Sequence, residues 1–311
     1  MFLKKRLVNG AYYWSIAKSY RDKGKPRQHI IQNLGTTEKA VSILENNQEY
    51  GQFLDEILLF ALSPYNKTSP ILKYPGAKWN LSQWIINFFP PHKVYMEPYF
   101  GSGAVLFNKR PSKIETINDM DGNVVNLFKV IRENPMKLAE IIEMTPWARD
   151  EYYKSYELSG DSLEDARRFL VRCWQAFGTK TCNRTGWRHS AAKNAPNMPA
   201  QWIKVPERIT ATANRLKKVQ IDNMPAIDLI KKYNQEETLI YADPPYLLST
   251  RSGKMYKHEM SEEDHVELIK TLLNHKGSVI LSGYDNDIYN ELLKGWKKES
   301  VKTTAEQEHK E

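Results

Sequence analysis

Hydrophobic and polar positions divide the chain into two unlike parts, which meet near residue 66. In the first part, the turn residues Asn9-Gly10 lie between a short apolar-containing run and a run rich in aromatic and β-branched residues at 12–17. The turn residues 22–25 then precede a third run at 29–34. A helical spacing of apolar residues follows over 38–62. Short runs between turn residues are typical of hairpin strands. The pattern therefore predicts a three-stranded unit followed by a helix.

The second part, from residue 71 onward, alternates two periodicities. Residues 123–132 and 261–274 have helical spacing, and Ser261 with Asp264 forms a pair that commonly starts a helix. Between such segments lie apolar runs typical of buried strands, at 93–97, 114–119, 238–243 and 277–282. Strands separated by helices indicate a doubly wound, Rossmann-like parallel α/β sheet, in which ligands bind at the carboxyl ends of the strands.

Charge is distributed unevenly along the chain. Residues 1–35 carry eight Lys/Arg and only Asp22, and residues 166–218 carry twelve Lys/Arg and only Glu207. These two segments sum to +7 and +11, whereas the whole chain carries +8, so the remainder is acidic. Two basic, aromatic-containing segments on an acidic body favour contact with a nucleic acid. Two solvated basic faces would be the alternative.

Bulk properties exclude several other classes. No run of about 18 apolar residues could span a membrane, and the first residues lack the apolar core of a secretory signal. Cys173 and Cys182 lack histidines at zinc spacing, so we expect free thiols in a cytoplasmic protein and no metal site.

A glycine-containing loop directly follows the first strand of the second part. Gly101 and Gly103, separated by one residue, allow a sharp turn and a close backbone approach to a ligand. Leu106 stands where a dinucleotide-binding loop would carry its third glycine, which disfavours a dehydrogenase. Asp119 ends the next strand, where an acid can accept hydrogen bonds from ribose hydroxyls.

A second loop, Asp243-Pro244-Pro245-Tyr246, ends another buried strand. Prolines have no amide N–H, so this turn presents acceptors. Asp243 and the Pro244 carbonyl can accept the two hydrogens of an aromatic amine, and Tyr246 can stack on its ring. A base inside a duplex must be flipped out to reach such a pocket. A proline-rich turn with an incidental acid is the alternative for the tetrapeptide alone.

Four elements in this order resemble those of the DNA adenine methylase (Dam-like) family, over residues 71–296. The segment 73–78 resembles the family's Lys-Trp-x-Gly-Gly-Lys element, with variants at Tyr74, Pro75 and Ala77. The segment 97–103 resembles its cofactor loop with Tyr99 in place of Phe, Asn118-Asp119 its ribose-binding element, and 243–246 matches its catalytic motif. The segment 282–286 resembles phage and prophage members.

The resemblance implies methyl transfer from S-adenosylmethionine, which becomes S-adenosylhomocysteine, to N6 of a flipped adenine in double-stranded DNA. Asp243, Pro244, Pro245 and Tyr246 would be catalytic. The residues implied for the cofactor are Tyr74, Gly76, Lys78, Glu97, Pro98, Tyr99, Gly101, Gly103, Asp119, Asp222, Asn223 and Asp243. Of these, Asp222 and Asn223 would lie against the cofactor's adenine, and Asp222 could equally be a turn residue.

The basic segment falls where the family places target recognition. We therefore expect residues 71–144 and 219–311 to form the methyltransferase domain, 145–218 a mainly helical inserted recognition region, and 1–66 a small basic accessory unit. In the insert, we expect DNA contacts from Arg172, Lys180, Asn183, Arg184, Trp187 and Arg188. Arginine can fork onto guanine edges or pair with phosphates, and aromatic rings can wedge between bases.

Alternatives remain at this point. The first is methylation of cytosine at N4, because the cytosine amine carries the same two hydrogens. The second is a catalytically silent DNA-binding protein of a mobile element. The third is a methyltransferase that acts on RNA. The segment 19–28 with Leu34-Gly35 resembles the N-terminal strands of some insertion-sequence transposases. We expect a monomer or weak dimer that binds double-stranded DNA and no membrane. A cognate restriction enzyme is a possible further partner.

Overall fold

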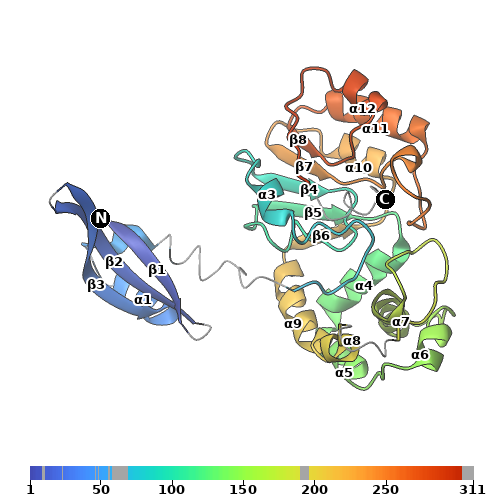
Figure 1. The fold of residues 1–311 in the computed structure, drawn as a ribbon, viewed down its shortest axis with the longest axis horizontal. Coiled ribbons are helices and arrows are strands. Elements are labelled where there is room, and N and C mark those ends of the chain that lie inside the picture. The colour runs from blue at the N-terminus through green and yellow to red at the C-terminus, as the bar shows by residue number, and fades with distance from the viewer. Residues whose placement is uncertain are drawn as a thin grey trace.

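The computed structural model describes residues 1–8, 11–22, 24–45, 47, 49–54, 57, 69–189 and 196–302. These residues form two β-sheets, each with its own helices and its own hydrophobic core (Figure 1). No helix among them is long and apolar enough to cross a membrane.

The first sheet is the predicted three-stranded unit. Its antiparallel strands, in the order β1-β2-β3, are β1 (Phe2–Val8), β2 (Ala11–Asp22) and β3 (Lys25–Thr36). After them come the helix α1 (Thr37–Glu45) and the short 3-10 helix η1 (Gly51–Phe53). Asp22 pairs with Lys25, which confirms the second predicted turn, and Val8 pairs with Ala11 around Asn9-Gly10, a turn that lies outside the described residues. The buried core consists of Trp14, Ile16, Leu34, Ala40, Leu44 and Ile57.

The prediction of one continuous helix from residue 38 was wrong, because α1 ends at Glu45. The Asn47 side chain accepts hydrogen bonds from the backbone amides of Glu49 (2.9 Å) and Tyr50 (3.0 Å). An Asn side chain that bonds the backbone ahead of it stabilises a turn in place of a helix. Farther along the predicted helix, Leu54 and Ile57 are helical. Residues 46, 48, 55, 56 and 58–62 lie outside the described residues.

The second sheet is the predicted doubly wound one. It is fully parallel, in the order β6-β5-β4-β7-β8. Its strands are β4 (Val94–Glu97), β5 (Ile114–Asn118), β6 (Val219–Asp222), β7 (Thr238–Ala242) and β8 (Ser278–Leu281). The chain runs outward from β4 to β6 and then returns to the other side of β4 as β7. A crevice therefore opens between the loops after β4 and β7, where such sheets bind ligands.

Helices cover both faces of this sheet, on opposite sides in Figure 1. Alternation along the strands explains this, because Tyr95 and Tyr241 pack in one core cluster whereas Met96 and Ile240 pack in the other. The helices are α3 (Ser82–Ile86), α4 (Gly122–Glu133), α5 (Pro135–Glu143), α6 (Arg149–Lys154), α7 (Ser162–Gln175), α8 (Met198–Trp202), α9 (Val205–Leu216), α10 (Ala226–Lys232), η2 (Leu248–Thr250), α11 (Glu262–Leu273) and α12 (Asp287–Leu292). Ser261 and Asp264 form the expected reciprocal cap of α11.

The described part of the predicted insert at 145–218 is mainly helical, as predicted, and contains α6 to α9. These helices share a hydrophobic core with the sheet, because Phe169, Trp174, Trp202 and Ile209 belong to the same buried cluster as Phe128 of α4. The insert therefore packs on the sheet domain through a continuous core.

Candidate active site

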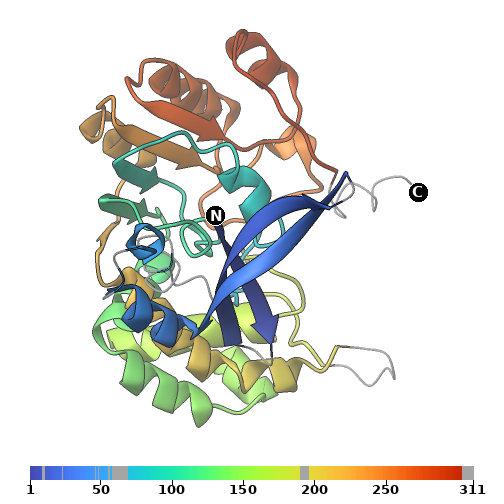
Figure 2. The ribbon, with the colours of Figure 1, turned by 90° about the vertical axis from the view of Figure 1, so that its left-hand side faces the viewer.

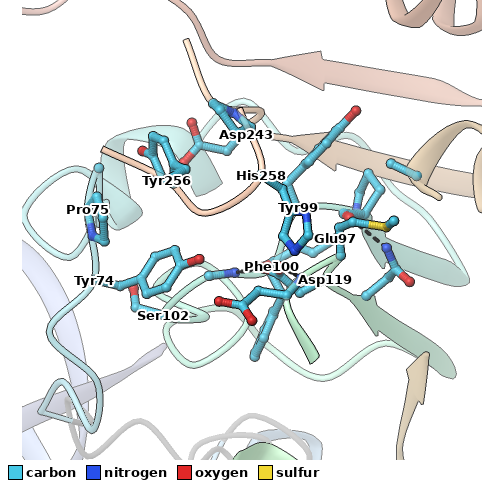
Figure 3. Close-up of a pocket in the computed structure, with 18 of the residues that line it drawn as sticks. Tyr74, Pro75, Glu97, Tyr99, Phe100, Ser102, Asp119, Asp243, Tyr256 and His258 are labelled. Carbon is cyan, nitrogen blue, oxygen red and sulfur yellow. Dashed lines mark hydrogen bonds between the residues drawn. The ribbon is translucent and has the colours of Figure 1, made fainter. Parts of the chain in front are cut away.

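A cavity of about 360 Å³ lies at the carboxyl ends of β4, β5 and β7. Its wall contains six carboxyl side chains, from Glu97, Asp119, Asp121, Asp243, Glu259 and Asp264. It also contains five aromatic rings, from Tyr74, Tyr99, Phe100, Tyr241 and Tyr256, and one lysine, Lys78. In Figure 3, Asp243 and Tyr256 lie on one side, and Tyr74, Ser102 and Asp119 face them. Such a wall suits a cationic ligand that carries an aromatic ring.

The loop after β4 owes its shape to two glycines. Gly101 and Gly103 have φ of 50° and 68°, in the left-handed region that favours glycine. A Cβ on Gly103 would lie 2.3 Å from the Phe100 ring and 2.5 Å from the Phe107 ring. Gly101 lines the cavity, whereas the role of Gly103 is to let these two rings pack beneath the loop.

Asn118 fastens two loops that border the cavity. Its amide nitrogen donates to the carbonyls of Pro98 (2.9 Å) and Met224 (3.0 Å), and its carbonyl accepts from the Met224 amide (2.9 Å). The side chain is 1% exposed. The sequence located Asn118 beside the ribose-binding acid, but a buried amide that joins two loops has no signal in a single sequence.

Asp119 is held by backbone amides, as expected for a fixed ligand-binding acid. Its two oxygens accept from the amides of Gly101 (2.8 Å) and Asp121 (2.9 Å). Burial, the largest cause, raises its pKa to about 6. A carboxylate has about four acceptor sites, so Asp119 can accept further hydrogen bonds from a ligand.

Glu97 is a second buried acid in the cavity wall, 2% exposed. Burial raises its pKa to about 8, against the hydrogen bond that the Tyr95 hydroxyl donates to it and the nearby Lys109 charge. A bound cation would favour the ionised form of this carboxyl group.

The predicted catalytic loop places its acid in the wall of the cavity. Lys78 forms an ion pair with Asp243 (Nζ to Oδ2, 2.8 Å) and donates to the Gly76 carbonyl (2.6 Å). The Tyr246 hydroxyl donates to the other oxygen of Asp243 (3.2 Å). Asp243 and Lys78 are 16% and 12% exposed at their side chains, so the pair is accessible yet largely shielded.

The Tyr246 ring is fixed from several sides. It meets the Tyr284 ring edge to face, with centroids 4.8 Å apart, and the Lys78 ammonium lies 4.9 Å from its centroid. Arg251 donates to the Tyr246 carbonyl (2.8 Å). Tyr284 belongs to the late segment 282–286 that the sequence linked to phage relatives.

A wall formed by residues 251–260 was missed at the sequence level. Glu259 pairs with Arg251 and accepts from the amides of Met255 (2.7 Å) and Tyr256 (2.9 Å), which folds the segment onto itself. Tyr256, His258, Glu259 and Met260 thereby line the cavity. No regular pattern marks this segment, because its shape depends on one buried ion pair rather than on periodicity.

Most of the residues predicted for the cofactor line the cavity together. They are Tyr74, Gly76, Lys78, Glu97, Pro98, Tyr99, Gly101, Asp119 and Asp243, joined by Pro245 of the catalytic loop. Pro244 and Tyr246 of the same loop are not part of the cavity wall.

Asp222 and Asn223 do not line the cavity. Pro225, Ala226 and Ile227, just beyond them, do. Asp222 accepts from the Asn223 amide (2.9 Å), and the Asn223 side chain donates to the Asp119 carbonyl (2.7 Å). These two residues therefore shape the edge of the site through the backbone, and a direct role in binding stays a prediction.

The predicted DNA-contacting loop projects beside the site. The Ala176–Trp187 bridge closes its base, and the Phe177 amide donates to the Gly186 carbonyl (2.7 Å). Lys180, Asn183 and Arg184 are exposed, and Phe177 is 70% exposed.

Two bonds tie this loop to the cavity wall. The Thr181 amide donates to the Met255 carbonyl (2.7 Å), and the Lys257 amide donates to the Thr181 hydroxyl (3.1 Å). The basic loop and the wall at 251–260 are thus one connected surface.

Two of the residues predicted to contact DNA also have internal partners, and their contact with DNA stays a prediction. Arg172 on α7 donates to the Ser155 carbonyl (2.6 Å), and Trp187 donates to the Gln175 side chain (3.1 Å). Both are partly buried, so they stabilise the loop and its supporting helix.

Three cations gather near the base of the loop. Lys73 and Arg208 lie against the Trp174 ring, at 4.5 Å and 5.2 Å, and Lys73 and Arg188 both approach the Met198 sulfur, at 3.6 Å and 3.7 Å. Burial, followed by the charges of Arg188 and Arg208, lowers the pKa of Lys73 to about 8. Positive charge held this closely together favours a bound anion.

A parallel doubly wound sheet with these two loops at its switch point is the arrangement expected of an amino-methyltransferase. The chain belongs to the family of D12 class N6 adenine-specific DNA methyltransferases, whose sequence model matches residues 74–309. The predicted fold, family and adenine-directed activity are therefore confirmed, and the alternatives of cytosine methylation and of a silent DNA-binding protein find no support.

Curated relatives agree with this family. The chain is 28% identical over 252 residues to the type II methyltransferase M1.LlaDCHI of Lactococcus lactis subsp. cremoris, covering 76% of this chain and 88% of the relative. It is 25% identical over 260 residues to the type II methyltransferase M.MjaIII of Methanocaldococcus jannaschii, covering 74% and 89%. It is 25% identical over 262 residues to the DNA adenine methylase of Haemophilus influenzae, covering 78% and 88%.

The first sheet has a different relationship. Residues 4–51 match the N-terminal domain of IS1634 family transposases. This confirms the predicted resemblance to insertion-sequence transposases and extends it over the whole three-stranded unit.

Proposed function

We propose that the enzyme uses S-adenosylmethionine as methyl donor and binds it in the cavity at the carboxyl ends of β4, β5 and β7. The observation that carries this proposal is the wall itself, in which six carboxyl groups face one lysine and five aromatic rings. S-adenosylmethionine is cationic at its sulfonium and carries an adenine ring, so its charge and shape suit this lining. Glu97 and Asp119, whose raised pKa values reflect buried acids, would gain a counter-charge.

The residues present divide between the parts of such a ligand. Asp119, fixed by two amides, would accept hydrogen bonds from ribose hydroxyls. Pro225 and Ile227 offer an apolar surface for an adenine ring. Lys78, which is paired with Asp243, would hold the amino-acid end together with Tyr74 and Gly76 of the same segment.

Catalysis follows from the atoms of the 243–246 loop. When bound, the cofactor supplies an electrophilic methyl group. Asp243 accepts one hydrogen of the adenine amine and the Pro244 carbonyl accepts the other, which directs the nitrogen lone pair away from both acceptors. Tyr246, braced by Tyr284, stacks against the target base. No residue of the loop needs to become a covalent intermediate.

The target adenine must leave its duplex to reach Asp243, because the acid lies within the cavity rather than on an open face. The basic loop at 177–188 would hold the DNA while this happens. Arg184 and Lys180 would pair with phosphates, and the exposed Phe177 ring would lie against the disturbed base stack. Lys73, Arg188 and Arg208 offer a further phosphate site.

Titration calorimetry tests the cofactor directly. We expect S-adenosylmethionine and S-adenosylhomocysteine to bind with one site per chain, and NAD to show no heat of binding. Incubation with a methyl-labelled donor and duplex DNA, followed by digestion to nucleosides, should yield N6-methyladenine. A protein that binds neither adenosyl compound would overturn the cofactor assignment.

The DNA surface has its own test with a matched control. Arg184→Gln removes an exposed charge from the basic loop, whereas Arg110→Gln removes one just before β5, at the opposite edge of the sheet. Arg184→Gln should weaken duplex binding and flatten its salt dependence by about 0.9 in log–log slope, as expected for one lost phosphate contact. Equal effects of the two substitutions would refute this placement of DNA.

Three further expectations come from the sequence and from its resemblance to the Dam-like family. A cognate restriction enzyme, a monomeric or weakly dimeric state and a cytoplasmic location stay predictions. The type II relatives support the first of these.

A further inference from the structure

The hairpin of β2 and β3 is longer than its hydrophobic core requires. The core of this unit is gathered at one end of the sheet, around Trp14, Ile16 and Leu34. Beyond it, residues 18–21 and 24–31 are all exposed, and Figure 2 shows the paired strands extending away from α1. A two-stranded ribbon by itself is only marginally stable in water. The extension therefore contributes little to folding, which suggests that it serves binding.

The strand register gathers positive charge on one face of this extension. Lys18 lies opposite His29, Tyr20 opposite Arg27, and Asp22 opposite Lys25. Side chains on a strand alternate between faces, so these three pairs share one face. Asp22, the only acid in residues 1–35, is paired with Arg27 at 3.1 Å. The face is thus cationic with an exposed aromatic ring, since Tyr20 is 47% exposed.

The shape of the extension matches one polyanion in particular. Five residues of each strand, from the Lys18–His29 pair to the Asp22–Lys25 pair, span about 17 Å at the usual rise of a strand. The major groove of B-form DNA is about 12 Å wide and admits a two-stranded ribbon. The major groove of duplex RNA is too deep and narrow for side chains to read.

We propose that the β2–β3 hairpin is a second DNA-binding element, which lies along a groove of the duplex outside the methylation site. Lys18 and Lys25 pair with phosphates, Arg27 exchanges Asp22 for a phosphate, and Tyr20 packs against the sugar–phosphate edge. The inference rests on the family's DNA substrate and on no detail of the proposed catalytic loop. Tethering raises the effective concentration of DNA at the methyltransferase site.

The test uses the full chain and a charge-matched control. One variant carries Lys18→Gln, Lys25→Gln and Arg27→Gln. The control carries Arg110→Gln, Lys113→Gln and Lys276→Gln, three exposed cations that precede β5 and β8 at the amino edge of the large sheet. Fluorescence polarisation gives the Kd for a duplex of about 30 base pairs, roughly three helical turns, between about 50 and 200 mM salt.

The hairpin variant should bind the duplex more weakly, and its log Kd against log salt should be less steep by about 2 to 3, as for three lost phosphate contacts. The control should keep the wild-type slope, and kcat at saturating DNA should be the same in all three proteins. If the hairpin variant keeps the wild-type slope, the proposal is wrong. It is equally overturned if duplex RNA competes better than duplex DNA for the wild-type protein and this preference disappears in the hairpin variant. A loss of methyl transfer in every protein, with intact duplex binding, would instead count against the catalytic account alone.

Discussion

Gly76 and Tyr256 approach each other across the mouth of the cavity, where the segment 74–78 meets the wall at 251–260. A Cβ on Gly76 would lie 2.3 Å from the Tyr256 hydroxyl oxygen, and the next atom of that ring lies at 3.7 Å. Gly76→Ala therefore introduces a clash with a single oxygen atom. It also places alanine at φ of 67°.

The two costs can be separated by removing the oxygen. The left-handed backbone costs alanine about 1–2 kcal/mol, and forcing a methyl group into filled space costs about 1–3 kcal/mol more. Tyr256→Phe leaves the ring at 3.7 Å, an ordinary contact, so the double variant should retain only the backbone cost. The double variant should therefore lose about 1–3 kcal/mol less unfolding free energy than the sum of the losses in the two single variants. This difference exceeds the usual error of additivity, about 0.5 kcal/mol.

Urea unfolding of the wild type, both single variants and the double variant measures this coupling. Gly160→Ala supplies the control, because Gly160 has φ of 78° and nothing within 4 Å of its Cβ position. It should show the backbone cost alone and no coupling to Tyr256→Phe. Additive effects of Gly76→Ala and Tyr256→Phe would refute the contact that closes the site.

Two further predictions concern pH. Because burial holds the pKa of Glu97 at about 8, a cationic ligand should bind more tightly as pH rises toward 8, by up to about tenfold per pH unit; calorimetry should show this slope for S-adenosylmethionine and its loss in Glu97→Gln. The pKa of Lys73 is lowered to about 8 from 10.5, so folding disfavours its charge below pH 8 and this penalty fades as pH rises to 10.5. Lys73→Met should therefore stabilise the DNA-free protein at neutral pH, lose that advantage as pH rises in urea unfolding, and weaken duplex binding; an advantage independent of pH would contradict this assignment.

The sequence predicted the parts of the site that depend on strand ends. Glu97, Asp119 and Asp243 each follow or end a buried strand, and a parallel sheet brings all such ends to one edge. The glycine loop and the catalytic loop were found for the same reason. The two loops lie side by side at the crevice because of the order of the strands. In this order, β5 and β6 lie on one side of β4, and β7 lies on its other side.

Features that depend on a single side-chain contact could not be predicted from the periodicity of the sequence or from the ends of its strands. The wall at 251–260 is folded by the Arg251–Glu259 pair, and the loops around Asn118 are joined by its buried amide. The hydrogen bond from Arg172 on α7 to the Ser155 carbonyl also has no signal in its charge alone. Likewise, Asn47 stops the first helix through two backbone bonds that apolar spacing does not register.

Asp243 offers the most direct test of the catalytic account. Methyl transfer to duplex DNA and binding of S-adenosylmethionine should be measured side by side for the wild type, Asp243→Asn and Asp243→Ala. Asn keeps an acceptor oxygen for the amine and should retain part of the activity. Ala should lower kcat by at least about a hundredfold, the scale of one lost transition-state contact, with cofactor affinity largely unchanged. Near-wild-type formation of N6-methyladenine by Asp243→Ala would contradict the account.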